Sequence, residues 1–215
     1  MLTKEGCRVR QDRLRRRLSE AKIDAVAIVH PLEIYYFTGV LFPEQFPGQP
    51  ALLWIEARGD SWMIAHSDAG EPLVDACYTY ECSIGGTINP YMRTQLGELV
   101  VERLQASGTR AGRVGYQREF MPKLLSDQID RGLGTGPEWV DMDEGLHRMQ
   151  EIKDDDEIAL IRKAIEVDLA AYTAAQKVIA PGVNELEVLG AAQQAAHLAA
   201  GEKVFHDGDY QCGQP

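Results

Sequence analysis

The pattern of apolar and polar positions predicts an α/β arrangement at the start of the chain. Val9, Leu14 and Leu18 recur at helical spacing, which predicts an amphipathic helix over residues 9–21. Residues 23–30 (IDAVAIVH) then form a continuous apolar run, as in a strand that is buried on both faces. A helix followed by a buried strand indicates a sheet covered by helices.

The next apolar runs indicate that the sheet is mixed. Residues 51–55 and 62–65 are separated by a short polar segment with Gly59 in its turn, which is typical of an antiparallel hairpin. Before them, residues 34–37 are typical of a short strand. The loop that follows, 38–50, contains three prolines and two glycines, so it is long and stiff.

Turn signals and apolar spacing predict further elements up to about Gly145, which complete one mixed sheet flanked by helices. These are strands over 77–81, 113–116 and 139–142, a helix over 91–106, and a second helix that starts at Pro122 and ends at 132–137. We therefore predict an α/β first domain over residues 1–150.

The pattern changes near Lys153, where a long amphipathic helix is predicted. Asp154 and Glu157 have the spacing of a capping box. An apolar stripe then follows at Ile158, Ile161, Ile165, Leu169, Tyr172 and Ile179. A helix over 155–179 would be about 38 Å long at the usual rise per residue, which is more than the first domain needs. It is therefore expected to belong to a second unit.

This second unit looks unfinished. Pro181 and Gly182 end the long helix, and Asn184 with Glu187 repeats the capping-box spacing before a helix over 185–200. Residues 204–212 resemble the start of a strand. Two helices and one strand cannot bury each other's apolar faces as a sheet-based domain, so 151–215 is predicted to be an incomplete α+β domain.

Composition narrows the classes of function. The 33 acidic and 22 basic residues give a net charge of −11, which disfavours nucleic acid and anionic lipid as partners. The arginines at 13, 15, 16 and 17 are interpreted as the solvated face of the first helix. No apolar run approaches the roughly 20 residues of a membrane span, and a signal-peptide layout is missing, so we expect a cytoplasmic protein.

Local motifs for metal binding or nucleophilic catalysis are weak. Cys77 and Cys82 fit neither zinc-ribbon nor redox spacing, and the four cysteines are interpreted as buried or idle thiols. Residues 206–209 (HDGD) could offer imidazole and carboxylate donors, but too few for a closed site, so a polar loop is the preferred interpretation. His197 has no acidic partner at HExxH spacing, and no Gly-x-Ser-x-Gly elbow occurs.

Three segments together resemble the creatinase, prolidase and aminopeptidase P family, whose catalytic domain has the pita-bread fold. They are His30-Pro31 leading to residues 34–39 (IYYFTG), the junction 148–153 (RMQEIK) with residues 157–164, and residues 180–185 (APGVNE). The resemblance covers nearly the whole chain. It implies that 1–150 is the N-terminal domain and that 151–215 holds the first two helices and first strand of the catalytic domain.

In such enzymes, two divalent metal ions (Mn, Co or Zn) are held by two aspartates, a histidine and two glutamates. They activate a water against the amide bond that precedes proline. Those ligands follow the strand that is expected to begin at Val204. The resemblance therefore implies that this chain contains no catalytic residue and no metal ligand, and that it is inactive on its own. The histidine that creatinase uses without metal also lies beyond the equivalent of Gly213.

The resemblance also suggests substrate-binding residues. In family dimers the loop between Gly39 and Ala51 can reach the neighbouring subunit's active site, and here it offers Phe42, Phe46 and Gln49. It lacks the arginine with which creatinase clamps a carboxylate, so a peptide or another small molecule is favoured over a creatine-like substrate. Tyr210 matches by position a strand that lines the substrate cleft. The loop aromatics could equally form a partner-binding patch or pack beneath their own loop.

Three functional hypotheses follow. The chain is a partial Xaa-Pro peptidase, homodimeric in its complete form and acting on a peptide or small molecule. Alternatively, it is a non-catalytic module for dimerisation or partner binding. The third hypothesis is a fragment of an amidinohydrolase or lyase on the same scaffold.

Overall fold

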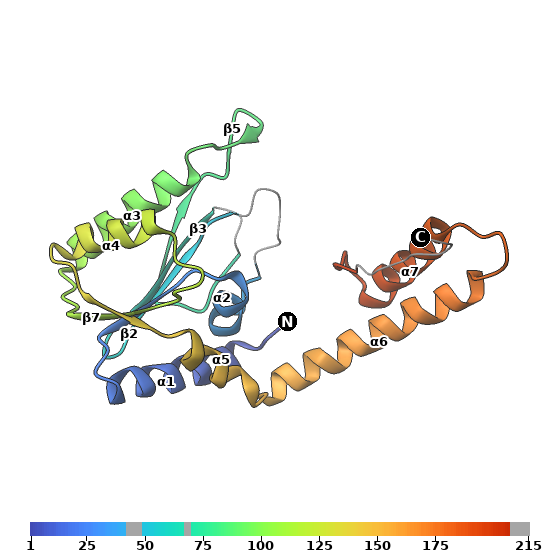
Figure 1. Cartoon of the computed structure of the whole chain (residues 1–215), viewed down its shortest axis with the longest axis horizontal. Coiled ribbons are helices and arrows are strands. Elements are labelled where there is room, and N and C mark those ends of the chain that lie inside the picture. The colour runs from blue at the N-terminus through green and yellow to red at the C-terminus, as the bar shows by residue number, and fades with distance from the viewer. Residues whose placement is uncertain (42–48, 67–69, 207–215) are drawn as a thin grey trace. The chain divides into compact units, whose positions relative to one another are not determined.

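A computed structural model describes residues 1–41, 49–66 and 70–206. The chain forms two compact units, Met1–Ile152 and Lys153–Pro215 (Figure 1). In the described residues, no helix is long and apolar enough to cross a membrane.

The first unit is the α/β domain that the sequence predicts, although the order of its elements differs from the prediction at three places. Its elements are α1 (Lys4–Glu20), β1 (Ala25–Ile28), α2 (Pro31–Thr38), β2 (Leu52–Glu56), β3 (Ser61–His66), β4 (Ala76–Tyr80), β5 (Ser83–Ile84), β6 (Thr87–Ile88), α3 (Met92–Ser107), β7 (Arg113–Tyr116), α4 (Lys123–Leu133), β8 (Glu138–Asp141) and α5 (Asp143–Glu151).

A six-stranded mixed sheet in the order β4-β3-β2-β1-β7-β8 forms the centre of this unit. Strand β2 is antiparallel to both β1 and β3, whereas the pairs β1–β7, β3–β4 and β7–β8 are parallel. Every strand except β2 therefore ends at the same edge of the sheet. The predicted mixed sheet and the predicted β2–β3 hairpin are both confirmed.

Alternate strand residues point to two different helical layers, because successive side chains of a strand face opposite sides of its sheet. Val26 and Ile28 pack in one core with Leu14 of α1, Phe37 of α2 and Leu146 of α5. In the other core, helices α3 and α4 pack on the strand residues that face the opposite side of the sheet. The helix residues are Leu96, Val100, Leu104, Leu125 and Ile129, and the strand residues are Ala25, Ala27, Trp54 and Trp62. Figure 1 shows α3 and α4 on one side of the sheet and α1 with α5 on the other.

The predicted strand over 34–37 is wrong, because these residues belong to helix α2. Pro31 stands at the first turn, where its fixed φ suits a helix start, and Gly39 ends the helix in the left-handed conformation at φ 76°. Ile34, Phe37 and Thr38 are buried at helical spacing. The apolar run is too short for its period alone to distinguish a strand from a buried helix.

Three elements were not predicted, namely helix α5 and the two short strands β5 and β6. Helix α5 continues directly from β8 through the junction segment, and it buries Leu146 and Met149 on one face. The residues around Gly85 and Gly86, both with positive φ, form the turn of a small β5–β6 hairpin. Turn-forming residues rather than periodicity define that hairpin, since both strands are only two residues long.

Helix α1 begins earlier than predicted and buries a charged residue. Thr3 caps it, and the Thr3 hydroxyl accepts a hydrogen bond from the Gly6 amide. Arg10 is fully buried, where its Nε donates to the Tyr36 carbonyl and its guanidinium lies over the Tyr36 ring. Val9, expected to be buried, is 45% exposed.

The second unit pairs α6 (Asp155–Val178) with α7 (Glu185–Ala200), and both predicted capping boxes are present. The two helices pack through small residues, chiefly Ala171 and Ala175 against Ala192 and Ala196. The apolar stripe predicted on α6 is not the buried face in this chain. Its residues Ile158, Ile161, Ile165, Leu169, Tyr172 and Ile179 are between 38% and 65% exposed. Residues 204–206 form no strand, and the rest of the predicted strand lies outside the described residues.

Candidate functional site

A cavity of about 300 Å³ lies in the first unit, at the edge of the sheet where β1 and β7 end. Its wall is formed by the segment after β1, helix α2, the segment before β2, helix α3, the segment after β7 and helix α4. The lining residues are Val29, His30, Pro31, Ile34, Gln49, Pro50, Ala51, Arg93, Leu96, Phe120, Pro122, Leu124 and Leu125. The helical layers on the two faces of the sheet thus meet at this cavity.

The topology of the sheet explains this position. After β1 the chain passes through α2 to β2 on one side of β1, and after β7 it passes through α4 to β8 on the far side of β7. The connections therefore leave the gap between β1 and β7 in opposite directions. A crevice forms at such a switch point, outside the carboxyl ends of the strands, and ligands of open α/β sheets commonly bind there.

Hydrogen bonds hold the turn that links β1 to the cavity. The buried Gln117 side chain, just after β7, accepts through its Oε1 from the Val29 amide at 2.7 Å and from the His30 amide at 2.9 Å. One side chain thereby ties the ends of the two parallel strands together. The backbone on both sides of the switch point is fixed by this contact.

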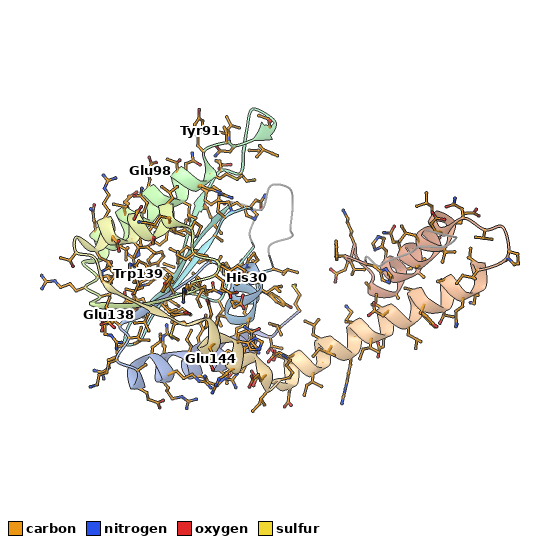
Figure 2. The ribbon with its side chains drawn as sticks, viewed as in Figure 1. His30, Tyr91, Glu98, Glu138, Trp139 and Glu144 are labelled. Carbon is orange, nitrogen blue, oxygen red and sulfur yellow. The ribbon has the colours of Figure 1, made fainter. Side chains whose placement is uncertain are left out.

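His30 lies on the cavity wall at the start of α2 (Figure 2). Its Nδ1 contacts the Glu33 carboxylate one turn along the helix, and the other Glu33 oxygen accepts from Gln150 Nε2 at 3.3 Å. The imidazole also packs on the Phe120 ring, with the centroids 4.2 Å apart. The Glu33 carboxylate therefore contacts His30 and the α5 residue Gln150, and Glu33 does not line the cavity.

The wall of the cavity is apolar apart from a few polar groups. Gln49 and Arg93 lie on the wall with His30. The Gln49 Oε1 atom is buried and has no hydrogen-bond partner among the described residues. Arg93 is exposed, and no ion pair joins it to any residue in the described ranges. The cavity is therefore lined mainly by aliphatic and aromatic side chains, with His30, Gln49 and Arg93 as the polar residues of its wall.

Of the substrate-binding residues predicted from the sequence, only Gln49 can be placed. Phe42, Phe46 and Tyr210 lie outside the described residues, and so do the last three residues of the HDGD segment. His206 is described, and its Nε2 lies 4.0 Å from a carboxylate oxygen of Asp168. His197 is half-buried and accepts a hydrogen bond from the Val204 amide.

The residues that the structure describes do not fit a dinuclear metal centre. Within them no three His, Cys, Asp or Glu side chains gather closely enough to hold a metal ion. Such a centre needs several carboxylate and imidazole donors around two cations. We therefore derive no catalytic step through a metal for the described part of this chain.

Ionisable groups with shifted pKa values lie away from the cavity. Burial raises the pKa of Tyr80, and partial desolvation also raises the pKa of the Cys77 thiol, although Cys77 is exposed. Burial likewise raises the pKa of Asp143. The Ser61 amide, which donates to the Asp75 carboxylate at 2.7 Å, lowers the pKa of Asp75. These shifts mark structural contacts, and none of the four groups lines the cavity.

Sequence reasoning found the His30-Pro31 motif but gave neither His30 nor Arg93 a place in a site. His30 could have been found, because it directly follows a buried parallel strand and the carboxyl end of such a strand is a common ligand position. No sequence signal identifies Arg93, which comes to the cavity only because α3 crosses from β4 back to β7.

Comparisons with known proteins agree with this fold. Residues 10–152 match the sequence model of the Creatinase/Prolidase N-terminal domain. Curated protein sequences give no match. Solved structures with similar folds include the prolidase from Pyrococcus horikoshii OT3 (17% identity, TM-score 0.66, 88% of this chain and 48% of that chain). A second similar structure is the X-Pro aminopeptidase from Thermotoga maritima MSB8 (18% identity, TM-score 0.66, 88% of this chain and 49% of that chain). A third is the Xaa-Pro dipeptidase from Bacillus anthracis (16% identity, TM-score 0.65, 89% of this chain and 49% of that chain).

The mixed sheet with helices on both faces defines an α/β domain of the creatinase N-terminal type. Since the family match spans most of the first unit and more than half of the chain, the chain belongs to the Creatinase/Prolidase N-terminal domain family. It spans about half the length of the solved structures that it matches.

Proposed function

We propose that this chain is the N-terminal part of a Xaa-Pro peptidase of the prolidase and aminopeptidase P type. Residues 1–150 would be its N-terminal domain, and 151–215 would begin its catalytic domain. The family match over 10–152 carries this proposal. The similar folds of a prolidase, an X-Pro aminopeptidase and a Xaa-Pro dipeptidase support it, because in each the similarity extends over more of this chain than the first domain alone.

The exposed stripe of α6 gives independent physical support. Six large apolar side chains lie along one side of the helix, while α7 covers a different face through small residues. A helix that is apolar on more than one face is normally buried on both. A further part of a catalytic domain that covers the stripe would account for these side chains.

We propose that the metal-dependent chemistry belongs to a part of the protein that the described residues do not contain. In the complete family member, two divalent ions (Mn, Co or Zn) would supply the activated water that attacks the peptide bond. The described residues do not provide the donors for such a centre. The 215-residue chain is therefore proposed to be inactive on its own.

Substrate contacts from this chain remain part of the proposal. Phe42, Phe46 and Gln49 would approach the substrate in the active site of a neighbouring subunit, and Tyr210 would line the cleft of its own. Homodimer formation and a cytoplasmic location stay predictions, and sedimentation velocity on the purified chain would test the first.

The coding sequence downstream of codon 215 tests the proposal directly. If the chain is part of such a peptidase, the open reading frame continues and encodes two aspartates, a histidine and two glutamates as metal ligands. A stop codon directly after Pro215, in a chain that folds and takes up no manganese, would favour the non-catalytic module instead.

A further inference from the structure

We propose that the cavity between β1 and β7 binds a small neutral aromatic alcohol, such as a phenol, whose hydroxyl donates a hydrogen bond to His30 Nε2. The other contacts of the ligand would be with Leu96, Phe120 and Leu125, which line the cavity and belong to the first unit. This binding site does not depend on the proposed peptidase function.

The contact between His30 and Glu33 determines which nitrogen of the imidazole carries the proton. His30 Nδ1 contacts an oxygen of the Glu33 carboxylate, and a carboxylate can only accept a hydrogen bond. Nδ1 is therefore the protonated nitrogen of the neutral ring. Nε2 then keeps its lone pair and acts as an acceptor. The other Glu33 oxygen accepts from Gln150 Nε2, so the carboxylate is held from two sides.

His30 Nε2 is available to a ligand. It forms no hydrogen bond with any residue that the structure describes, and it is not one of the buried side-chain atoms that lack a partner. The His30 side chain is 25% exposed. Glu33, which holds the Nδ1 edge of the ring, is not part of the cavity wall, whereas His30 is part of it. So is Phe120, whose ring packs on the imidazole. We therefore place the opposite edge, with Nε2, towards the cavity.

The rest of the wall favours one apolar ring. The volume of about 300 Å³ is at the lower end of the range for small-molecule pockets, so it suits a molecule with a single ring better than a peptide. Leu96 and Leu125, both buried, line the cavity together with Pro122 and the Phe120 ring. Transfer of an aromatic ring from water to such aliphatic and aromatic surfaces is favourable.

The same contacts indicate an uncharged ligand. An anion has no hydrogen to donate to Nε2, and the Glu33 carboxylate lies beside the imidazole on a chain whose net charge is −11. Arg93 also lines the cavity, but it is exposed, so solvent screens its charge. An ammonium group could donate, but an apolar wall does not replace the water that such a charge loses. A neutral hydroxyl on an aromatic ring meets all of these conditions.

The test is a titration of the 215-residue chain at about pH 8, where imidazole is neutral, followed by NMR. Three probes share one ring: 4-methylphenol has the donor, 1,4-dimethylbenzene has a methyl group in its place, and 4-methylbenzoate carries an anion. We expect 4-methylphenol to bind with a dissociation constant in the low millimolar range or below and to shift the amide signals of Val29, Leu96 and Leu125. The 4-methylbenzoate should bind at least about fivefold more weakly.

The nitrogen NMR signals of the His30 side chain provide a test that needs no variant. In the free protein Nδ1 should be protonated and Nε2 unprotonated. The Nε2 signal should change as 4-methylphenol is added, and it should change less with 1,4-dimethylbenzene, which has no hydrogen to donate.

Variants separate the hydrogen bond from the burial of the ring, because both probes bury the same ring. The ratio of the 4-methylphenol affinity to the 1,4-dimethylbenzene affinity should fall roughly fivefold in His30→Phe, which keeps a ring but loses the acceptor. Glu33→Gln should lower this ratio about twofold, because an amide does not hold the proton on Nδ1. His147→Phe is the matched control and should leave the ratio unchanged, since His147 is an exposed histidine of α5 that does not line the cavity.

An unchanged ratio in His30→Phe, or an equal fall in His30→Phe and His147→Phe, would overturn the proposal. Tighter binding of 4-methylbenzoate than of 4-methylphenol, or a protonated Nε2 in the free protein, would overturn it as well. So would the absence of shifts at the cavity residues up to about 10 mM 4-methylphenol. If His30→Phe does not fold, the nitrogen signals of the wild type and the ratio in Glu33→Gln decide. None of these readouts measures peptide hydrolysis, so their outcome is independent of the proposed peptidase function.

Discussion

The hydroxyl of Tyr36 in α2 donates a hydrogen bond of 2.9 Å to the backbone carbonyl of Met149 in α5. Tyr36 belongs to the IYYFTG segment and Met149 to the RMQEIK segment, which are 113 positions apart in the sequence. Two of the segments that resemble the family thus contact each other in the fold. The contact fixes the last helix of the first unit against the helix beside the cavity.

Replacement of this hydroxyl should destabilise the first unit. Tyr36→Phe leaves the buried Met149 carbonyl without its donor, so we expect a loss of about 1–2 kcal/mol in the free energy of unfolding. Urea denaturation followed by circular dichroism measures it. Tyr35→Phe is the matched control: the Tyr35 hydroxyl accepts from the Leu2 amide near the N-terminus, where a smaller loss is expected. Equal losses in both variants would contradict this role for Tyr36.

A glycine permits close packing between α3 and α4. A Cβ atom on Gly132 would lie 2.9 Å from Leu104 Cδ1 and 3.3 Å from the Val101 Cα. We expect Gly132→Ala to lower the free energy of unfolding by about 1–3 kcal/mol, despite the better helix propensity of alanine. Gly145→Ala in α5 is the control, because its Cβ would meet Met142 at an ordinary 3.6 Å. The free energy of unfolding of Gly145→Ala should rise by up to about 1 kcal/mol. If Gly132→Ala were the more stable of the two variants, Gly132 would not be a packing residue.

Asp75 should make stability depend on pH in the acid range. Hydrogen bonds from Ser61 lower the pKa of Asp75 in the folded state, so its charged form is favoured by folding. The resulting stability is present above the ordinary pKa of 3.8 and is lost as the pH falls through the lower folded value. Because the carboxylate is half-exposed, Asp75→Asn should cost only about 0.5–1 kcal/mol at pH 7.

Urea unfolding at several pH values between 2 and 7 would measure this effect. The difference between the wild type and Asp75→Asn should shrink as the pH drops below about 4. Asp60→Asn, in the exposed turn between β2 and β3, should show no such convergence. A difference that is constant across the whole range would rule out the carboxylate as its source.

The two apolar faces of α6 should respond differently to substitution. Leu169→Gln together with Tyr172→Gln changes exposed side chains, so stability should stay within about 0.5 kcal/mol while binding of a hydrophobic dye falls. Ala171→Leu forces a larger side chain into the α6–α7 contact and should cost about 1–3 kcal/mol. Unchanged dye binding in the double variant would mean that the stripe is not the exposed apolar surface that we describe.

The sequence predicted most of the first unit because β1, β2 and β3 are nearly continuous apolar runs bounded by clear turns. The prediction failed at α2, where a short apolar stretch fits a helix and a strand equally well until Pro31 and Gly39 are read as its ends. Helix α5 was missed because it follows β8 without a loop. On α6 the stripe of large residues dominated the pattern, whereas the face buried in this chain consists of small residues such as Ala171 and Ala175.

The candidate site was less predictable than the fold. Gln49 was named from a family resemblance, and His30 lay in a recognised motif without a role. Arg93 is brought to them only by the crossover from β4 to β7, and a contact that depends on strand order leaves no local signal in a single sequence.

Hydrolysis of a Xaa-Pro dipeptide by the purified 215-residue chain in the presence of manganese tests the central claim most directly. Leu-Pro is a suitable substrate, and calorimetric titration of the same sample with Mn²⁺ reports whether a metal centre forms. Our account predicts no turnover above the buffer control and no tight stoichiometric metal binding. Sustained Leu-Pro cleavage with about two manganese ions bound per chain would contradict it.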